Sequence, residues 1–212
     1  MLRNNYLLAG LVGLAGIVLY YVISNNDSSA GDLGAPVDAA VYRQQLTTDR
    51  QAKDTFFRTS ADSPLPDKTH FAGLAYFAPD PAYRVVARLE PFADKTQKLA
   101  VTMSDGSEEV YEKYAHAVFS LGGQAHRLLV VKLGDTYSIL FRDATSGRET
   151  YGGGRYLELD PKQMEANRAL LDFNAAYNPY CAYAPGYACP LPPAENTLPI
   201  AIRAGERYVP HE

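Results

Sequence analysis

The sequence predicts a mainly β domain, an antiparallel meander that forms a sandwich or a partly closed barrel, with one N-terminal helix and a transmembrane helix in front of it. After residue 82, apolar and polar residues alternate in several short segments, as in half-buried strands. Turns of two to four residues separate these segments, which is typical of antiparallel connections. The composition of the 212 residues, 47% hydrophobic with a net charge of −4, excludes a disordered chain and gives no basic surface for nucleic acid.

The chain opens with an apolar segment. The 17 residues from Leu7 to Ile23 contain no charge and no amide. As a helix at about 1.5 Å per residue they reach about 26 Å, close to the about 30 Å of a bilayer core. Arg3 precedes the segment and Asp27 follows it, so we expect the N-terminus inside.

Residues 1–23 are therefore expected to be an uncleaved, single-pass anchor in the inner (cytoplasmic) membrane, with the remaining chain periplasmic or otherwise extracytoplasmic. A cleaved signal peptide is the first alternative, because Ser28, Ser29 and Ala30 resemble a cleavage site. A buried soluble helix is the second.

A polar tether, residues 24–37, leads to a predicted helix from about Asp38 to Arg58. Asp38 is a suitable N-cap, and Leu46 and Phe57 belong to an imperfect apolar stripe. The proline pair at residues 64 and 66 ends the helix. The other face is expected to be solvated; its charged residues are Arg43, Asp49, Arg50, Lys53 and Asp54.

The strands follow as one meander, so residues 38–212 are expected to be a single extracytoplasmic domain. Turns are expected at residues 104–107, 122–123 and 134–135, where glycine, serine and aspartate gather. The predicted strands cover residues 83–90, 99–103, 117–121, 128–133 and 137–141.

The two cysteines lie close together in the C-terminal third. Cys181 and Cys189 bound a nine-residue span rich in turn formers, which outside the cytoplasm predicts a disulfide. Such a bond would stabilise the fold by about 2.5 kcal/mol in the chain-entropy model. Free thiols and half of a metal site are the alternatives, although the spacing is not C-x-x-C.

Several motifs in the same third of the chain match a known family. They are DATSG (143–147), TYGGGRYL (150–157), DFN (172–174), AYNP (176–179), CAY (181–183), CPLPP (189–193), EN (195–196) and AGE (204–206), with weaker matches KD (53–54), SPL (63–65) and FAGLAYF (71–77). The chain thereby resembles the domain of unknown function 1684 family of bacterial and archaeal proteins. The resemblance implies a shared fold and a shared polar centre, and it brings no established activity.

The polar side chains of these motifs are the candidate ligand-binding residues. The glycine-rich stretch lacks the lysine of a phosphate-binding loop, so it is interpreted as a turn or bulge; a ligand cleft in which Arg155 binds a carboxylate or phosphate is the alternative. The candidates are Asp143, Thr150, Tyr151, Gly153, Arg155, Asp172, Asn174, Tyr177, Asn178, Glu195 and Asn196.

Asp172, Asn174 and Asn178 are expected to cap a short helix and fold back on the chain. A cation site or a pocket for a hydroxyl-rich ligand are the alternatives. Neighbouring tyrosines, Tyr177 among them, are expected to pack the proline-rich loop rather than to face a ligand.

Catalytic and metal motifs are weak. The four histidines are scattered and Ser146 lies in no G-x-S-x-G elbow, so neither a zinc hydrolase nor a serine hydrolase of those types is predicted. No metal or other cofactor is expected. The remaining catalytic candidates are Asp172 and Glu195 as acid and base, with Arg155 orienting the substrate.

We therefore expect a membrane-anchored binding or interaction module, or an accessory subunit of an envelope complex, whose partner is an envelope protein or a carbohydrate. A hydrolase acting on envelope carbohydrate or on a small ester is the alternative function.

Overall fold

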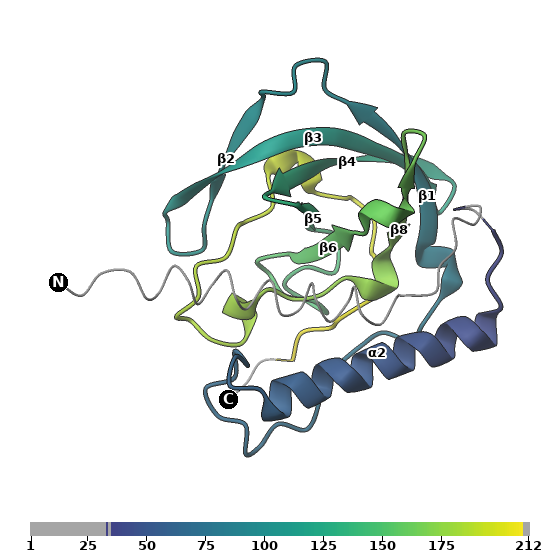
Figure 1. Ribbon diagram of the computed structural model, residues 1–212. Coiled ribbons are helices and arrows are strands. Elements are labelled where there is room, and N and C mark those ends of the chain that lie inside the picture. The colour runs from purple at the N-terminus through teal and green to yellow at the C-terminus, as the bar shows by residue number, and fades with distance from the viewer. Residues whose placement is uncertain (1–32, 34, 210–212) are drawn as a thin grey trace.

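The computed structural model describes residue 33 and residues 35–209 and contains one long helix and one antiparallel sheet (Figure 1). The apolar segment that predicts a membrane anchor lies outside these residues. Within them, no helix has both the length and the apolar character that a membrane span requires. The elements are α2 (Ala39–Thr59), β1 (Arg84–Pro91), β2 (Lys98–Thr102), β3 (Glu108–Leu121), β4 (Gln124–Leu133), β5 (Thr136–Phe141), β6 (Arg155–Leu159), β7 (Met164–Glu165) and β8 (Arg168–Asp172), with short 3-10 helices η1 (Pro81–Tyr83), η2 (Pro161–Gln163), η3 (Phe173–Ala175), η4 (Tyr180–Ala182) and η5 (Ala194–Asn196).

The strands form a curled half-barrel. Their order is β6-β5-β4-β3-β1-β8-β7, β2 pairs with β3, and all pairs are antiparallel. Between β6 and the segment that follows β8, one bridge forms, in which Tyr156 and Tyr177 exchange two backbone hydrogen bonds of 2.9 and 3.0 Å. Of the two predicted architectures, the partly closed barrel is therefore correct, and the two-sheet sandwich is not.

Helix α2 agrees with its prediction within one residue at each end. The Asp38 carboxylate accepts hydrogen bonds from the backbone N–H groups of Ala40 (2.8 Å) and Val41 (3.0 Å), which otherwise have no partner at a helix start. Leu46 and Phe57 are the buried residues of the helix. The helix crosses the side of the half-barrel opposite the long strand β3 (Figure 1).

Strands β1, β2, β4 and β5 appear where alternation predicts them, whereas β3 is much longer than predicted and β6 and β8 were not predicted. In β3 the pairing with β4 shifts register between Lys113 and Ala115, and such an irregularity breaks the period of two. Strand β6 is buried at four of its five residues, so its sequence does not alternate.

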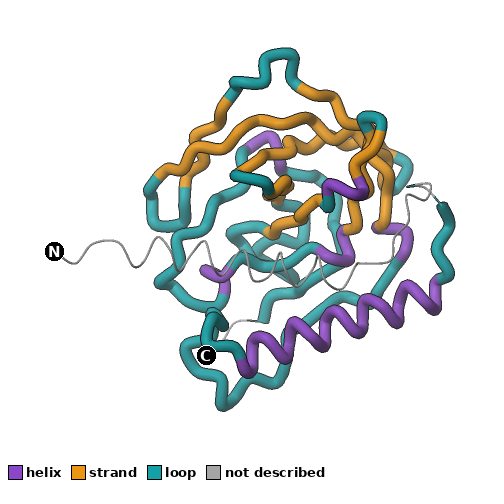
Figure 2. The backbone as a smooth tube through the Cα atoms, viewed as in Figure 1, coloured by secondary structure: helices purple, strands orange, loops and turns teal. Residues whose placement is uncertain are grey.

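The interior of the half-barrel is filled by side chains from the sheet and from the C-terminal segment. Phe173, directly after β8, lies 5.5 Å from the Phe141 ring and 5.6 Å from the Phe119 ring, measured between centroids. Leu198 and Ile202 join the same buried cluster. Loops, drawn in teal in Figure 2, run between the sheet and α2. The burial of Leu198 and Ile202 makes the C-terminal segment part of the core.

Asn196 takes the place of sheet pairing between β4 and β5. Its amide accepts from the backbone N–H of Leu129 (2.6 Å) and donates to the carbonyls of Leu129 (2.9 Å) and Leu140 (2.8 Å). The side chain is fully buried. Asn196 therefore hydrogen-bonds three backbone groups that water cannot reach. This candidate ligand-binding residue has a structural role in the sheet.

Candidate functional site

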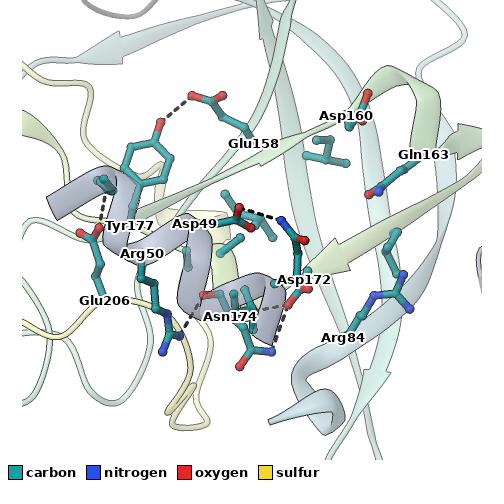
Figure 3. A pocket seen from close by; sticks show the side chains of 18 of the residues that line it. Asp49, Arg50, Arg84, Glu158, Asp160, Gln163, Asp172, Asn174, Tyr177 and Glu206 are labelled. Carbon is teal, nitrogen blue, oxygen red and sulfur yellow. Dashed lines mark hydrogen bonds and ion pairs between the residues drawn. The ribbon is translucent and has the colours of Figure 1, made fainter. Parts of the chain in front are cut away.

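A cavity of about 550 Å³ lies between α2 and the strands β6 and β8 (Figure 3). Its volume is within the range of small-molecule sites. Apolar side chains from both sides, Leu46 of α2 with Leu157, Leu159 and Leu170 of the sheet, form part of its wall. Its charged lining residues are Asp49, Arg50, Lys53, Arg84, Asp135, Glu158, Asp160, Asp172 and Glu206.

One face of α2 supplies much of the wall. Tyr42, Asp49, Lys53 and Phe56 recur at spacings of three to seven residues and all line the cavity, as a single helical face should. Asp49, Arg50 and Lys53 are partly buried here. The expectation that these three charges lie on a solvated face is therefore wrong, because the imperfect apolar stripe turns its polar neighbours toward the half-barrel as well.

Tyr42 and Asp172 join the helix to the end of β8. The Tyr42 hydroxyl donates to the Asp172 carboxylate, 2.7 and 2.8 Å from its two oxygens. Asp172 also accepts from the backbone N–H and the side-chain amide of Asn174, each at 3.0 Å. Burial, and then the charge of Asp172, raises the pKa of Tyr42, so Tyr42 is a hydrogen-bond donor at neutral pH.

Lys53 and Glu206 join the helix to the C-terminal segment. The Lys53 ammonium is 2.5 Å from one oxygen of Glu206 and lies 4.7 Å from the centre of the Tyr177 ring. The other Glu206 oxygen accepts from the Asn178 backbone (2.8 Å) and from the Tyr183 hydroxyl (2.9 Å). Glu206 is 1% exposed, and its charge is thus fully compensated.

Two other carboxylates of the cavity are not compensated in this way. The Tyr177 hydroxyl donates to one oxygen of Glu158 at 2.6 Å, and within residues 35–209 no side chain or backbone group hydrogen-bonds the other. Burial raises the pKa of Glu158, against the Tyr177 hydrogen bond and the attraction of Lys53. Burial likewise raises the pKa of Asp49, whose hydrogen-bond partner is the Gln45 amide at 3.0 Å. Neither carboxylate forms a salt bridge with a described lysine or arginine.

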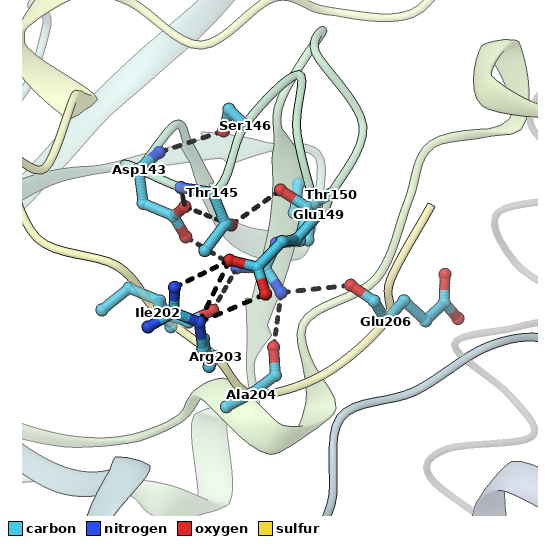
Figure 4. Close-up of polar contacts among 10 residues, drawn as sticks. Asp143, Thr145, Ser146, Glu149, Thr150, Ile202, Arg203, Ala204 and Glu206 are labelled. Carbon is cyan, nitrogen blue, oxygen red and sulfur yellow. Dashed lines mark hydrogen bonds and ion pairs between the residues drawn. The ribbon is translucent and has the colours of Figure 1, made fainter. Parts of the chain in front are cut away.

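Arg155 does not line the cavity. It donates to Asp143, and the polar centre around Asp143 is shown in Figure 4. Its guanidinium donates to the Asp143 carboxylate (2.7 Å) and to the carbonyls of Ile202 (2.8 Å), Ala204 and Glu206 (3.2 Å). The side chain is 1% exposed. Burial lowers the pKa of Arg155 and the charge of Asp143 opposes this shift. Four hydrogen bonds to protein groups and almost no exposure to solvent indicate that the guanidinium stabilises the fold.

The glycine-rich stretch completes this centre. Asp143 also accepts hydrogen bonds from the backbone N–H (2.6 Å) and the hydroxyl of Thr145, and that hydroxyl is 2.9 Å from the Thr150 hydroxyl. Gly154 has φ +97° and packs directly against Pro192 and the Phe141 carbonyl. A side chain has no room there, which supports the interpretation of the stretch as a turn.

The structure brings only some of the predicted site residues together. Asp172, Asn174 and Tyr177 line the cavity. The Glu195 carboxylate is instead 2.9 Å from a ring nitrogen of His116. The Glu195 side chain is exposed and is not part of the cavity wall. The remaining candidates outside the wall are Asp143, Thr150, Tyr151, Gly153, Arg155, Asn178 and Asn196.

The three catalytic candidates therefore do not share a pocket. Asp172 caps η3 and accepts from Tyr42, Arg155 is enclosed, and Glu195 pairs with a histidine elsewhere. The geometry gives the hydrolase hypothesis no assembled acid–base pair.

The sequence offered signals for the residues that were missed. Tyr42, Asp49 and Lys53 share a helical face with Leu46, and Glu158 interrupts the apolar run from Tyr156 to Leu159. A charge inside an otherwise buried strand is uncommon. It indicates either a paired charge or a wall facing a polar cavity.

The predicted disulfide is not formed in the structure. Cys181 and Cys189 are both free thiols. The backbone N–H of Cys181 is 3.1 Å from the Cys189 sulfur, so the two residues are neighbours, as the short span requires.

The part of the chain that the structure describes contains no cluster of three or more histidine, cysteine, aspartate or glutamate residues able to hold a metal ion.

Comparisons with known proteins agree with this fold. The family described as "Protein of unknown function (DUF1684)" matches residues 69–207. An uncharacterized protein of Haloarcula marismortui, solved by solution NMR, is 38% identical and superimposes with a TM-score of 0.64, over 80% of this chain and 96% of that one. No curated protein matches significantly.

Proposed function

This chain belongs to the DUF1684 family, and from that premise we propose that it is a binding module whose cavity between α2 and the half-barrel takes a small molecule with an apolar body and a protonated amine. The observation that carries the proposal is the pair of carboxylates, Glu158 and Asp49, on a partly apolar wall and without a cationic partner among the described residues.

The size and the wall of the cavity support a small organic ligand. About 550 Å³ accommodates a molecule of drug-like size or smaller. Leucines on both sides offer contact to an apolar body, and burying such a body contributes about 25 cal/mol for each Å² removed from water.

The charges support an amine as the polar group. Lys53 already pairs with Glu206, and Arg50 donates to the carbonyls of Phe77 (2.9 Å) and Asn174 (3.4 Å). An anionic ligand would thus meet cations that already have partners, beside the carboxylates of Glu158 and Asp49. A protonated amine has donors only, and it would supply the charge that Glu158 lacks.

The two ends of the cavity differ in charge, and this difference also favours an amine. Arg84 is the backbone partner of Asp172 across β1 and β8, which places a cation at the Asp172 end. Neither Glu158 nor Asp49 forms a salt bridge with an arginine or lysine of the described chain. The amine is therefore assigned to the Glu158 end.

The test compares three probes with one ring and different head groups: benzylamine, benzyl alcohol and benzoate. Binding to the full chain is measured by ligand-observed NMR at neutral pH. We expect benzylamine to bind at least tenfold more tightly than benzyl alcohol, with benzoate the weakest. Equal binding of all three contradicts the charge assignment, and binding of none contradicts the cavity as a ligand site.

A variant series assigns the effect to the cavity. Glu158→Gln keeps the shape of the side chain and removes its charge, so it should abolish the preference for benzylamine while benzyl alcohol still binds. Glu108→Gln is the matched control, because Glu108 is exposed at the start of β3. If both variants behave alike, the preference arises from the overall negative charge.

We further propose that residues 7–23 anchor the chain in the cytoplasmic membrane, so that the cavity faces the extracytoplasmic side, where the protein acts alone or as a subunit of an envelope complex. The support is the uncharged 17-residue segment between Arg3 and Asp27. Protease treatment of intact and of opened cells tests it: the domain should be cleaved from the outside and remain membrane-bound until then. Recovery in the soluble fraction contradicts it.

A further inference from the structure

We propose that Cys181 and Cys189 form a redox-active dithiol, which is reversibly oxidised to an intramolecular disulfide by exchange with a small disulfide. The proposal rests on the contacts of the loop that holds the two thiols, and it is independent of the ligand of the cavity.

The loop holds the two sulfurs next to each other. Cys181 lies in η4, and its backbone N–H donates to the Cys189 sulfur at 3.1 Å. Each of the two thiols also shifts the pKa of the other. The pair therefore reaches a bond with small movements of the side chains.

Cys189 is the fixed member of the pair. Its backbone N–H donates to the Ser104 hydroxyl (3.0 Å) and its carbonyl accepts from the Ser104 backbone (2.8 Å). Leu191 then donates to the carbonyl of Thr102 (2.8 Å). These bonds attach the end of the loop to the turn between β2 and β3, and Cys189 itself is only 6% exposed.

Cys181 is the accessible and more acidic member. It is partly exposed, and the Tyr151 hydroxyl lies 3.9 Å from its sulfur as a donor. The hydrogen bond from Cys189, with a further one from Tyr151, lowers the pKa of Cys181 to about 7 despite burial. The same interaction raises the pKa of Cys189. At neutral pH a large share of Cys181 is thus thiolate, the nucleophilic form.

The reaction follows from this division. The Cys181 thiolate attacks one sulfur of the small disulfide, a mixed disulfide forms, and the first thiolate leaves. Cys189 loses its proton to solvent, attacks the Cys181 sulfur and expels the second thiolate. The protein loses two protons and two electrons, and the small disulfide is reduced to two thiols.

The environment also makes the disulfide reversible. Hydrogen bonds from Cys189 and Tyr151 stabilise the Cys181 thiolate, and they are lost or weakened when the disulfide forms. Stabilising the reduced form makes a disulfide more oxidising. A structural disulfide, in contrast, resists reduction by glutathione.

The test equilibrates the full chain in buffers that cover the range from reduced to oxidised glutathione, followed by alkylation and mass spectrometry. We expect both thiols to disappear together within that range and to return on reversal, with an intramolecular loss of two hydrogens. A disulfide that persists at the reducing end contradicts the proposal and identifies a structural bond. Thiols that persist at the oxidising end, or disulfides between chains, contradict it as well.

Single variants test the assigned order. Cys189→Ser should accumulate glutathione on Cys181, whereas Cys181→Ser should leave Cys189 unmodified under the same conditions. Tyr151→Phe should move the pH midpoint of iodoacetamide alkylation of Cys181 upward. Faster modification of Cys189 than of Cys181, or an unchanged midpoint in Tyr151→Phe, contradicts the assignment.

Discussion

The two polar centres of this protein differ in whether their charged side chains form ion pairs. Around Arg155, the guanidinium and the Asp143 carboxylate are both almost inaccessible, and four hydrogen bonds run from the guanidinium to that carboxylate and to backbone carbonyls. Figure 4 shows the surroundings of Asp143 in this centre. Three residues further along β6, Glu158 lines a cavity of about 550 Å³ together with Asp49, and neither carboxylate forms a salt bridge with a lysine or arginine in the described chain (Figure 3).

This difference separates residues that maintain the fold from residues able to act on a ligand. Asp143, Thr150 and Arg155, which carry much of the family resemblance, satisfy one another and the C-terminal segment. Substituting these residues should therefore lower the free energy of unfolding. Glu158 and Asp49 each keep a carboxylate oxygen without a hydrogen-bond donor among the described residues, so substituting them should alter ligand binding and the pH dependence of stability.

The largest effect is expected for Arg155→Ala, which leaves Asp143 buried without its cation. Removing one partner of a buried ion pair costs about 3–5 kcal/mol, enough to unfold much of a marginal domain. The free energy of unfolding of the full chain, from denaturant titration, checks this. The double change Asp143→Leu with Arg155→Met should recover part of the loss, and a single variant as stable as the parent would contradict the structural role.

The next largest effect is expected for Asn196→Ala. The substitution leaves the N–H of Leu129 and the carbonyls of Leu129 and Leu140 without their side-chain partner. Each buried unsatisfied group costs about 1–3 kcal/mol, and some relaxation of β4 onto β5 is expected, so the net loss should be about 3 kcal/mol. Gln124→Ala, at the exposed start of β4, is the control and should change stability by less than about 0.5 kcal/mol.

For Glu158→Gln we expect a change in the free energy of unfolding that depends on pH and is small at low pH. The pKa of Glu158 is raised by burial, so between the unfolded value near 4.5 and the raised folded value the native state binds more protons than the unfolded one. Stability is therefore lost as pH rises through that window, by at most about 1.4 kcal/mol per pH unit.

The measurement is the melting temperature of the parent and of Glu158→Gln across that pH range. The difference in favour of the variant should grow with increasing pH and then level off. A difference that is constant with pH would show that the pKa of Glu158 is not raised. The cavity would then not disfavour the charged form of this carboxylate.

The smallest effect is expected at Val41, which is 69% exposed on α2. Val41→Ser should change the free energy of unfolding by less than about 0.5 kcal/mol and leave benzylamine binding unchanged. A clear loss of either would mean that the exposed side of α2 contacts a further part of the protein.

Which parts of the structure can be predicted from the sequence depends on whether their signals are local. Local signals were sufficient for α2, where Asp38 caps the first turn, and for strands such as β2, where exposed and less exposed residues alternate. The β6 strand has no such alternation, because both of its faces are covered. The cavity could not be predicted at all, since its walls come from a helix and from strands more than a hundred residues later in the chain.

By itself, then, the sequence determined a mainly β domain led by one capped helix, with the turns between its strands and a compact set of polar family residues. These follow from backbone preferences and hydrophobic periodicity within a few residues. Only the tertiary structure decided what each polar residue does. Burial and hydrogen-bond partners arise from long-range packing. They enclose Arg155 as a structural cation, whereas Glu158, three residues away, lies beside a cavity with one oxygen that no described residue hydrogen-bonds.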